Sequence, residues 1–381
     1  MEAEFGLPQW GFRRATYGFE KEGKLICSYF KDGLWHLASL DTRTLQLQTF
    51  MIPYTAIKYV HITGGNVYFI AGSATELQAL VQLNPNTVEI KILRRSGVVT
   101  VDAEYISAGQ SIEFPTDNGL TAYGYFYPPK NKDFTGLQDS LPPLLVLSHG
   151  GPTAATIAVF NYEIQYWTTR GFAVLDVNYG GSTGYGRSYR ERLDGQWGVV
   201  DVADCVNGAR YLVDQKRVDG NQLAIVGGSA GGYVTLCAIT FYKVFNAAAS
   251  YFGLSDLEAF VKETHKFESR YLDSLVGPYP EQRELYVSRS PIHFIEQIAC
   301  PLILIQGLDD PIVPPNQSEM IYEALRKRGV PVAYLSFPGE QHGFVKAENN
   351  RRALEAEAYF YSKIFNFELA DQIEPVKIEN L

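Results

Sequence analysis

Short runs of alternating hydrophobic and polar residues fill the first third of the chain, up to about residue 110. Residues 24–30 and 66–71 are two such runs, and the pairs Asp32-Gly33 and Gly64-Gly65 lie beside them. Asp-Gly and Gly-Gly pairs favour the tight turns that join antiparallel strands. We therefore predict that this part of the chain is rich in β-structure.

The β-rich part contains an internal repeat. The segments LICSYF (25–30) and LDTRT (40–44) resemble VYFIA (67–71) and LNPNT (83–87), with a period of about 42 residues. That period is typical of one four-stranded propeller blade, and closed propellers have at least four blades. Two repeats cannot close a ring, so we expect them to pack on the rest of the chain, on a partner chain or in a homo-oligomer. A small β-sandwich is the alternative.

After residue 110 the pattern changes to compact apolar runs separated by longer amphipathic stretches. Residues 200–213 and 317–328 have helical periodicity, and Gly329 supplies a C-terminal cap for the second stretch. The alternation predicts an α/β domain over residues 111–381 with a doubly wound, mostly parallel sheet, preceded by the small all-β region 1–110. The predicted buried strands are residues 144–147, 173–177, 223–226, 247–251, 302–305 and 333–337.

Composition and charge narrow the class of protein. The chain has 381 residues, 46% of them hydrophobic, and a net charge of -9. A nucleic-acid-binding surface needs clustered Lys and Arg, so this balance argues against nucleic acid as a partner. We also expect no membrane span, because no apolar run reaches eighteen residues. Residues 1–10 lack the pattern of a secretory signal, which predicts a cytoplasmic protein.

The cysteines suggest neither a metal site nor a disulfide framework. They are widely spaced, contain no CxxC pair and are interpreted as buried free thiols: Cys27, Cys205, Cys237 and Cys300. No metal or organic cofactor is expected.

The most informative motif is GGSAGG at residues 227–232, which follows a predicted strand and precedes a helix expected to begin near Tyr233. A strand, a sharp turn and a helix form the nucleophile elbow of α/β-hydrolases. The positions two before and two after the nucleophile must be small, and here they are Gly227 and Gly231. Ser229 is therefore the candidate nucleophile.

A serine nucleophile needs a base, and the base needs an orienting carboxylate. In α/β-hydrolases the chain order is serine, acid, histidine. The predicted strand 302–305 leads into Asp309 and Asp310, and the spacing favours Asp310 over Asp309. His342 follows the predicted strand 333–337, precedes Gly343 and is the candidate base.

The same logic requires donors for the oxyanion. The segment SHGGP (148–152) leaves a predicted strand and resembles the HGGG-type oxyanion loops. We predict that the backbone N–H groups of Gly151 and Ala230 form the oxyanion hole. His149 precedes the nucleophile in the chain and is interpreted as a residue that fixes this loop.

Together these segments resemble the catalytic domain of the prolyl oligopeptidase family of serine peptidases, especially its acylaminoacyl-peptidase and dipeptidyl-peptidase-like branch. The resemblance spans most of residues 110–370. It rests on the motifs SHGGP (148–152), NYGGSTGYG (178–186), GQWGVVDVAD (195–204) and GSAGGY (228–233).

The resemblance implies a hydrolase of short peptides with a β-propeller that excludes folded proteins. The two repeats would then be the last blades of a truncated or separately encoded propeller. Exopeptidase, acylpeptidase and oligopeptidase activities stay open, and Ile312 stands where some relatives place an Arg or Asn. Apolar residues near the nucleophile either line a substrate pocket or pack in the core: Tyr233, Tyr251, Phe252, Leu257 and Phe260.

Three hypotheses for function follow. The first is a serine peptidase that forms an acyl-enzyme on Ser229. The second is an esterase or lipase-like hydrolase, because the same triad cleaves esters. The third is a non-catalytic interaction protein that keeps the fold, and the complete set of candidate groups argues against it.

Overall fold

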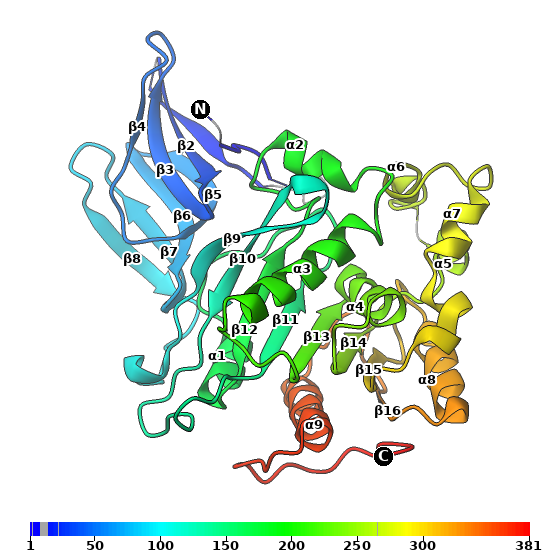
Figure 1. Ribbon diagram of the computed structural model, residues 1–381. Helices are drawn as coiled ribbons and strands as arrows, with labels where there is room; N and C mark the ends of the chain where they lie inside the picture. The colour runs from blue at the N-terminus through cyan, green and yellow to red at the C-terminus, as the bar shows by residue number, and fades with distance from the viewer. Residues whose placement is uncertain (2, 8–13, 22, 265) are drawn as a thin grey trace.

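Two four-stranded antiparallel sheets form the N-terminal part of the computed structural model (Figure 1), which describes residues 1, 3–7, 14–21, 23–264 and 266–381. Part of the N-terminal stretch 1–10 thus lies outside the described residues. In each sheet the strands follow their order in the chain, as in a propeller blade. The two predicted blades are confirmed: β1 (Tyr17–Lys21), β2 (Lys24–Lys31), β3 (Leu34–Asp41) and β4 (Leu47–Thr49), then β5 (Ala56–Thr63), β6 (Asn66–Ser73), β7 (Glu76–Leu83) and β8 (Ile90–Arg95).

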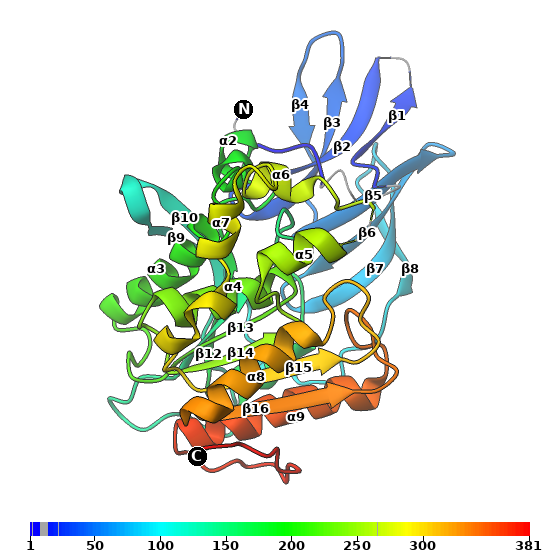
Figure 2. The ribbon, with the colours of Figure 1, turned by 90° about the vertical axis from the view of Figure 1, so that its right-hand side faces the viewer.

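The two blades share one apolar core. Ile26 and Phe30 of the first blade and Val67, Phe69 and Val81 of the second belong to the same buried cluster. Alternation along the strands explains this, because successive side chains point to opposite faces of a sheet. Figure 2 shows the blades at one end of the molecule and the C-terminus at the other.

The second part of the chain forms an eight-stranded sheet in the order β16-β15-β14-β13-β11-β12-β10-β9. The six strands from β11 to β16 are parallel, and β10 pairs antiparallel with β12. This is the predicted mostly parallel sheet. Its strands are β9 (Gln110–Pro115), β10 (Thr121–Tyr127), β11 (Leu144–Ser148), β12 (Ala173–Asn178), β13 (Leu223–Gly228), β14 (Ala247–Tyr251), β15 (Leu302–Gly307) and β16 (Val332–Phe337).

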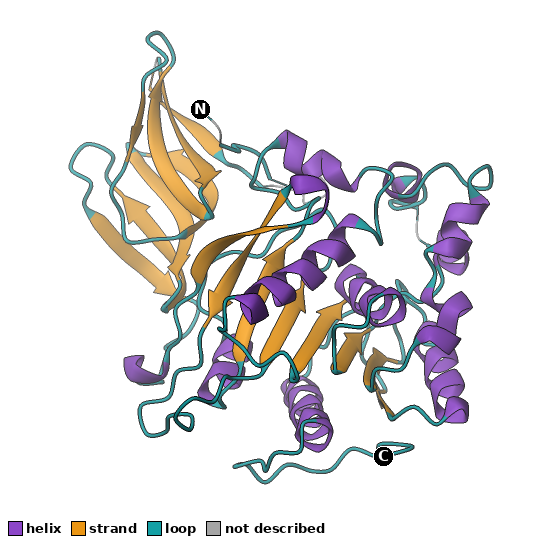
Figure 3. Cartoon of the chain, viewed as in Figure 1, coloured by secondary structure: helices purple, strands orange, loops and turns teal. Residues whose placement is uncertain are grey.

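Helices cover both faces of this sheet (Figure 3). On one face lie α3 (Val200–Asp214), α4 (Ala230–Phe241) and α8 (Asn316–Arg328), and on the other α1 (Tyr162–Thr169) and α9 (Ala347–Ile364). The strands β11 to β15 are buried on both sides, which is why they appear in the sequence as continuous apolar runs. Shorter helices complete this part: α2 (Arg187–Arg190), α5 (Leu257–Glu263), α6 (Tyr271–Leu275) and α7 (Arg283–Ser288).

Two predictions about helix ends have different outcomes. Helix α8 stops at Gly329, which has φ 76° as the predicted cap requires. Helix α4 begins at Ala230, directly after Ser229, so the expected start near Tyr233 is wrong. Gly231 and Gly232 lie in the first turn of α4, and they are glycines because the helix packs closely on neighbouring backbone there. A Cβ on Gly232 would lie 2.6 Å from the Cα of Gly253.

The four cysteines are buried and free. Burial raises the pKa of each thiol, to about 11 for Cys27, which leaves them poor nucleophiles. Among the described residues, no cluster of three or more His, Cys, Asp or Glu side chains could hold a metal ion. None of the described helices is long and apolar enough to cross a membrane.

Candidate active site

Ser229 occupies a sharp turn between β13 and α4. Its backbone has φ 58° and ψ -120°, a conformation that residues other than glycine rarely adopt. The neighbouring chain leaves no room for side chains at the flanking glycines. A Cβ on Gly231 would lie 2.0 Å from the carbonyl oxygen of Ser148, and one on Gly227 would lie 2.4 Å from the backbone of Gly231. This strained turn is the geometry of a nucleophile elbow.

Three side chains predicted from distant parts of the sequence meet at this turn. The distance from Ser229 Oγ to His342 Nε2 is 2.8 Å, and the distance from His342 Nδ1 to Asp310 Oδ2 is also 2.8 Å. Both lie within the range of a hydrogen bond. The imidazole therefore bridges the hydroxyl and the carboxylate.

The carboxylate of Asp310 is buried but well supplied with donors. Its Oδ1 accepts hydrogen bonds from the backbone N–H groups of Ile312 (2.8 Å) and Val313 (3.0 Å). Its Oδ2 faces His342, and the Gln306 amide lies 3.4 Å away. Asp309, the alternative acid, is exposed to solvent. The turn after β15 thus directs the second aspartate toward the imidazole and the first one outward.

A second buried carboxylate fixes the loop that carries His342. Glu340 accepts hydrogen bonds from the backbone N–H groups of Val345 (2.8 Å) and Lys346 (3.0 Å) and from the Asn349 side chain (2.7 Å). The hydrogen bond from the backbone of Val345 contributes most to lowering the pKa of Glu340. The loop therefore closes around a charged group two residues before the imidazole.

The candidate oxyanion loop follows β11 and passes close to Ser229. A Cβ on Gly150 would lie 3.6 Å from the Cβ of Ser229. The other predicted donor, Ala230, is the first residue of α4, where backbone N–H groups have no partner within the helix. Gly151 has φ 130°, which favours glycine. Both predicted donors thus belong to segments that adjoin Ser229.

His149 is held by its neighbours on both ring nitrogens. Nδ1 lies 2.8 Å from the carbonyl oxygen of Gly150, and Nε2 lies 2.8 Å from Ser182 Oγ. The ring also stacks on Tyr179 with 4.2 Å between the centroids. Burial lowers the pKa of His149 to about 4, so the ring is neutral near pH 7. These contacts fit a residue that fixes the loop.

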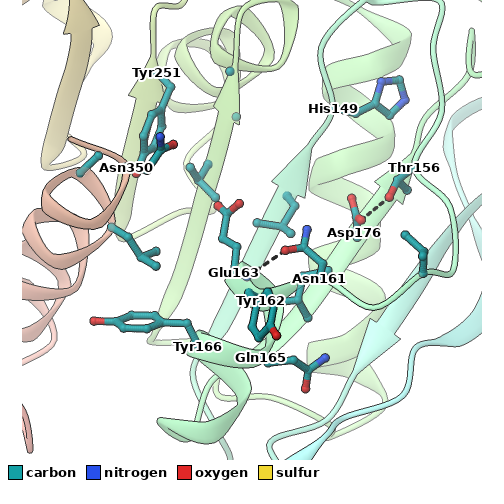
Figure 4. A pocket seen from close by; sticks show the side chains of 18 of the residues that line it. His149, Thr156, Asn161, Tyr162, Glu163, Gln165, Tyr166, Asp176, Tyr251 and Asn350 are labelled. Carbon is teal, nitrogen blue, oxygen red and sulfur yellow. Dashed lines mark hydrogen bonds between the residues drawn. The ribbon is translucent and has the colours of Figure 1, made fainter. Parts of the chain in front are cut away.

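A cavity of about 1510 Å³ opens beside Ser229 and His342 and extends between α1 and α9 (Figure 4). Tyr251 and Phe252, two of the predicted pocket residues, line it. The Phe252 ring lies 4.8 Å from the His342 ring, between centroids. For the other three predicted pocket residues the pocket assignment is wrong. They pack in the hydrophobic core on the α3 and α4 side of the sheet: Tyr233, Leu257 and Phe260.

Acidic groups occur along and behind the wall of this cavity. Burial raises the pKa of Asp176 to about 7 although Thr156 donates a hydrogen bond to it. The carboxyl group of Glu163 projects into the cavity. Behind Tyr251, burial raises the pKa of Glu357 to about 8. The Tyr251 hydroxyl donates a 2.7 Å hydrogen bond to Glu357.

The sequence did not reveal these acids or Glu340. Glu357 stands in an amphipathic helix, where a carboxylate normally indicates a solvated face. For Glu340 there was a usable signal, because it lies two residues before His342 in the same loop. Tyr271 carries no signal in the sequence either, and its hydroxyl lies 2.5 Å from Thr153 Oγ1 beside the oxyanion loop.

Comparison with known families agrees with this geometry. The sequence model of the prolyl oligopeptidase family matches residues 158–368, which is more than half of the chain. Dipeptidyl aminopeptidase BIII of Pseudoxanthomonas mexicana is 29% identical over 82% of this chain and 44% of its own length. The human acylamino-acid-releasing enzyme is 32% identical over 54% of this chain and 29% of its own length.

Among solved structures, a puromycin-hydrolyzing peptidase of Mycobacterium tuberculosis is 42% identical and superposes with a TM-score of 0.95. The match covers 100% of this chain and 57% of that protein. A crystal structure of puromycin hydrolase is 37% identical, again with a TM-score of 0.95, over 99% of this chain and 57% of its own length. This chain spans about half the length, or less, of the relatives it matches.

Proposed function

Because this chain belongs to the prolyl oligopeptidase family, we propose that it hydrolyses short peptides through an acyl-enzyme formed on Ser229. The observation that carries the proposal is the continuous hydrogen-bonded series Ser229–His342–Asp310, with 2.8 Å at each step. The serine hydroxyl is a weak nucleophile at neutral pH and requires such a base.

In the first half of the reaction, Ser229 Oγ attacks the carbonyl carbon of the scissile peptide bond. His342 Nε2 accepts the hydroxyl proton as the new C–O bond forms, and Asp310 stabilises the resulting imidazolium without taking the proton. The imidazolium then donates that proton to the leaving nitrogen. The C–N bond breaks, the amine product departs, and the acyl group stays on Ser229 as an ester.

In the second half, water attacks the ester while His342 accepts one of its protons. The tetrahedral intermediate collapses, and His342 returns the proton to Ser229 Oγ as the acid product leaves. In both halves the negative charge develops on the former carbonyl oxygen. The backbone N–H groups of Gly151 and Ala230 are the proposed donors to it, each contributing on the order of 10²- to 10³-fold in rate.

The substrate class is proposed from size and from the relatives. The cavity has room for several residues of an extended peptide, and the relatives are named for hydrolysis of dipeptidyl, acylamino-acid and puromycin substrates. We further propose that residues 1–110 and 111–381 are the two domains, and that the protein is cytoplasmic. We also propose that a partner chain or a second copy of this chain covers the open blade edge.

The experiment that tests the proposal compares two kinds of substrate on the full chain. Aminoacyl anilides and short peptides should be hydrolysed, and the activity should disappear in Ser229→Ala. Turnover of simple nitrophenyl esters alone would favour the esterase hypothesis instead. A library of free-amino and N-blocked peptides then separates aminopeptidase, acylpeptidase and endopeptidase activity.

A further inference from the structure

Glu4 links the N-terminal segment to the part of the chain that carries the site. Its backbone pairs with β2, because Glu4 N donates to Phe30 O (3.0 Å) and Phe30 N donates to Glu4 O (2.8 Å). Its side chain, however, points away from the blade into the loop 179–186. There it accepts hydrogen bonds from the backbone N–H groups of Gly184 (2.5 Å) and Gly186 (3.3 Å) and forms an ion pair with Arg190.

This arrangement is unusual for a glutamate, because the residue is only 9% exposed. A buried carboxylate is costly unless it is paired and hydrogen-bonded, and Glu4 has one cation and two backbone donors. The contact is also tight on the side of Phe30. Gly184 has φ 104°, and a Cβ there would lie 2.8 Å from the Phe30 ring. Glu4 and Phe30 of the N-terminal part therefore pack against one side of the loop 179–186.

The other side of the loop 179–186 contacts the candidate oxyanion loop. Ser182, which is fully buried, lies 2.8 Å from His149 Nε2 through its Oγ. Thr183 N donates a 2.8 Å hydrogen bond to Ala154 O. His149 in turn contacts the carbonyl oxygen of Gly150, the residue before the proposed oxyanion donor Gly151.

We propose that Glu4 is a positioning residue for the oxyanion hole. It fixes the loop 179–186, that loop fixes His149 through Ser182, and His149 sets where the N–H of Gly151 stands relative to Ser229. The inference rests on the proposed function, since it assigns the blade region a part in the rate of acyl transfer. A small displacement of a donor matters because the oxyanion forms only in the transition state.

The first test is Glu4→Gln in the full chain, with Glu89→Gln as the matched control. Glu89 is an exposed acid of the second blade. We expect kcat for an aminoacyl anilide to fall roughly 2- to 30-fold with KM changed less than about twofold, the pattern of a lost transition-state interaction. Amide hydrogen exchange in residues 149–154 and 181–186 should accelerate in Glu4→Gln and stay unchanged in Glu89→Gln.

The second test is a double-mutant cycle between Glu4→Gln and Ser182→Ala. If Glu4 acts through Ser182 and His149, the double variant should lose less kcat than the product of the two single losses. Multiplicative losses, or an unchanged kcat in folded Glu4→Gln, would overturn the inference. Should Glu4→Gln fold poorly, Arg190→Gln removes the ion pair, keeps the two backbone hydrogen bonds and is expected to show the same split at smaller size.

The outcomes also separate this inference from the proposed function. A wild-type chain that hydrolyses no peptide, anilide or ester contradicts both. An active wild type whose kcat and loop exchange are insensitive to Glu4 contradicts only the positioning role.

Discussion

The two ends of the cavity treat buried carboxyl groups in opposite ways. At the His342 end, Asp310 and Glu340 each accept at least two backbone N–H hydrogen bonds, and the pKa of Glu340 is lowered. Along and behind the cavity wall, Asp176 and Glu357 accept hydroxyl hydrogen bonds from Thr156 and Tyr251, and burial raises the pKa of both carboxyl groups. The difference teaches that backbone donors favour the charged form of a carboxyl group, and that enclosure favours the protonated form.

The largest expected effect comes from replacing the carboxylate of Asp310, at the His342 end of the cavity. Asp310→Asn should lower kcat by about 10⁴-fold, because the amide would stabilise the wrong imidazole tautomer and could not stabilise the imidazolium. Asp309→Asn is the matched control, since that neighbour is exposed, and it should stay near wild type. Steady-state kinetics on an aminoacyl anilide measures both, and comparable losses would break the distinction between the two aspartates.

The next effect concerns Glu357 and is measured as the free energy of unfolding at different pH values. Burial raises the pKa of Glu357 from its ordinary value near 4.5 to about 8, so the folded protein holds a proton that the unfolded chain releases. Stability should therefore fall as pH rises from about 4.5 to about 8, by a few kcal/mol at most at roughly 1.4 kcal/mol per pKa unit. Glu357→Gln should show a smaller decline, because Asp176, whose pKa burial raises to about 7, still contributes to it.

Urea unfolding of the Glu357→Gln variant and the wild type at pH 5 and pH 8.5 measures that decline. Glu348→Gln, in the exposed first turn of α9, is the control and should keep the wild-type slope. An equal slope in Glu357→Gln would show that Glu357 is ionised in the folded protein.

A smaller effect is expected at Glu340, with the opposite sign. Its lowered pKa means that it contributes stability above the unfolded pKa, and this stability is lost as pH falls through the folded pKa. Glu340→Gln should loosen the loop that carries His342 and lower kcat by roughly tenfold through misplacement of the base. Kinetics at pH 7 and thermal unfolding at pH 4 and pH 7 test both parts. A folded Glu340→Gln variant with the wild-type kcat would contradict the role of Glu340 in fixing the loop that carries His342.

The sequence predicted six of the eight strands of the large sheet, β11 to β16, because they appear as compact apolar runs. The antiparallel strands β9 and β10 were not predicted. It also predicted that Ser229, Asp310 and His342 would converge, since strand ends in a parallel sheet meet at one edge. It misplaced the start of α4 because Gly231 and Gly232 suggest a turn, whereas close packing of the helix on Ser148 and Gly253 requires these glycines.

The pocket and the cavity acids could not be predicted in the same way. An apolar residue such as Leu257 or Phe260 gives no sign of whether its face meets a cavity or the core. Glu357 and Asp176 are visible only when α9 and the sheet enclose them, because their altered pKa values come from burial. Glu4 likewise acquires its partners 180 residues or more later in the chain.

The most direct test of the central claim is covalent labelling of the folded chain with a fluorophosphonate, followed by mass spectrometry. The arrangement of Ser229, His342 and Asp310 predicts a single adduct on Ser229 that forms rapidly at pH 7, slowly in His342→Ala and not at all in Ser229→Ala. A folded wild-type chain that stays unlabelled, or that carries its adduct on another residue, would contradict the claim.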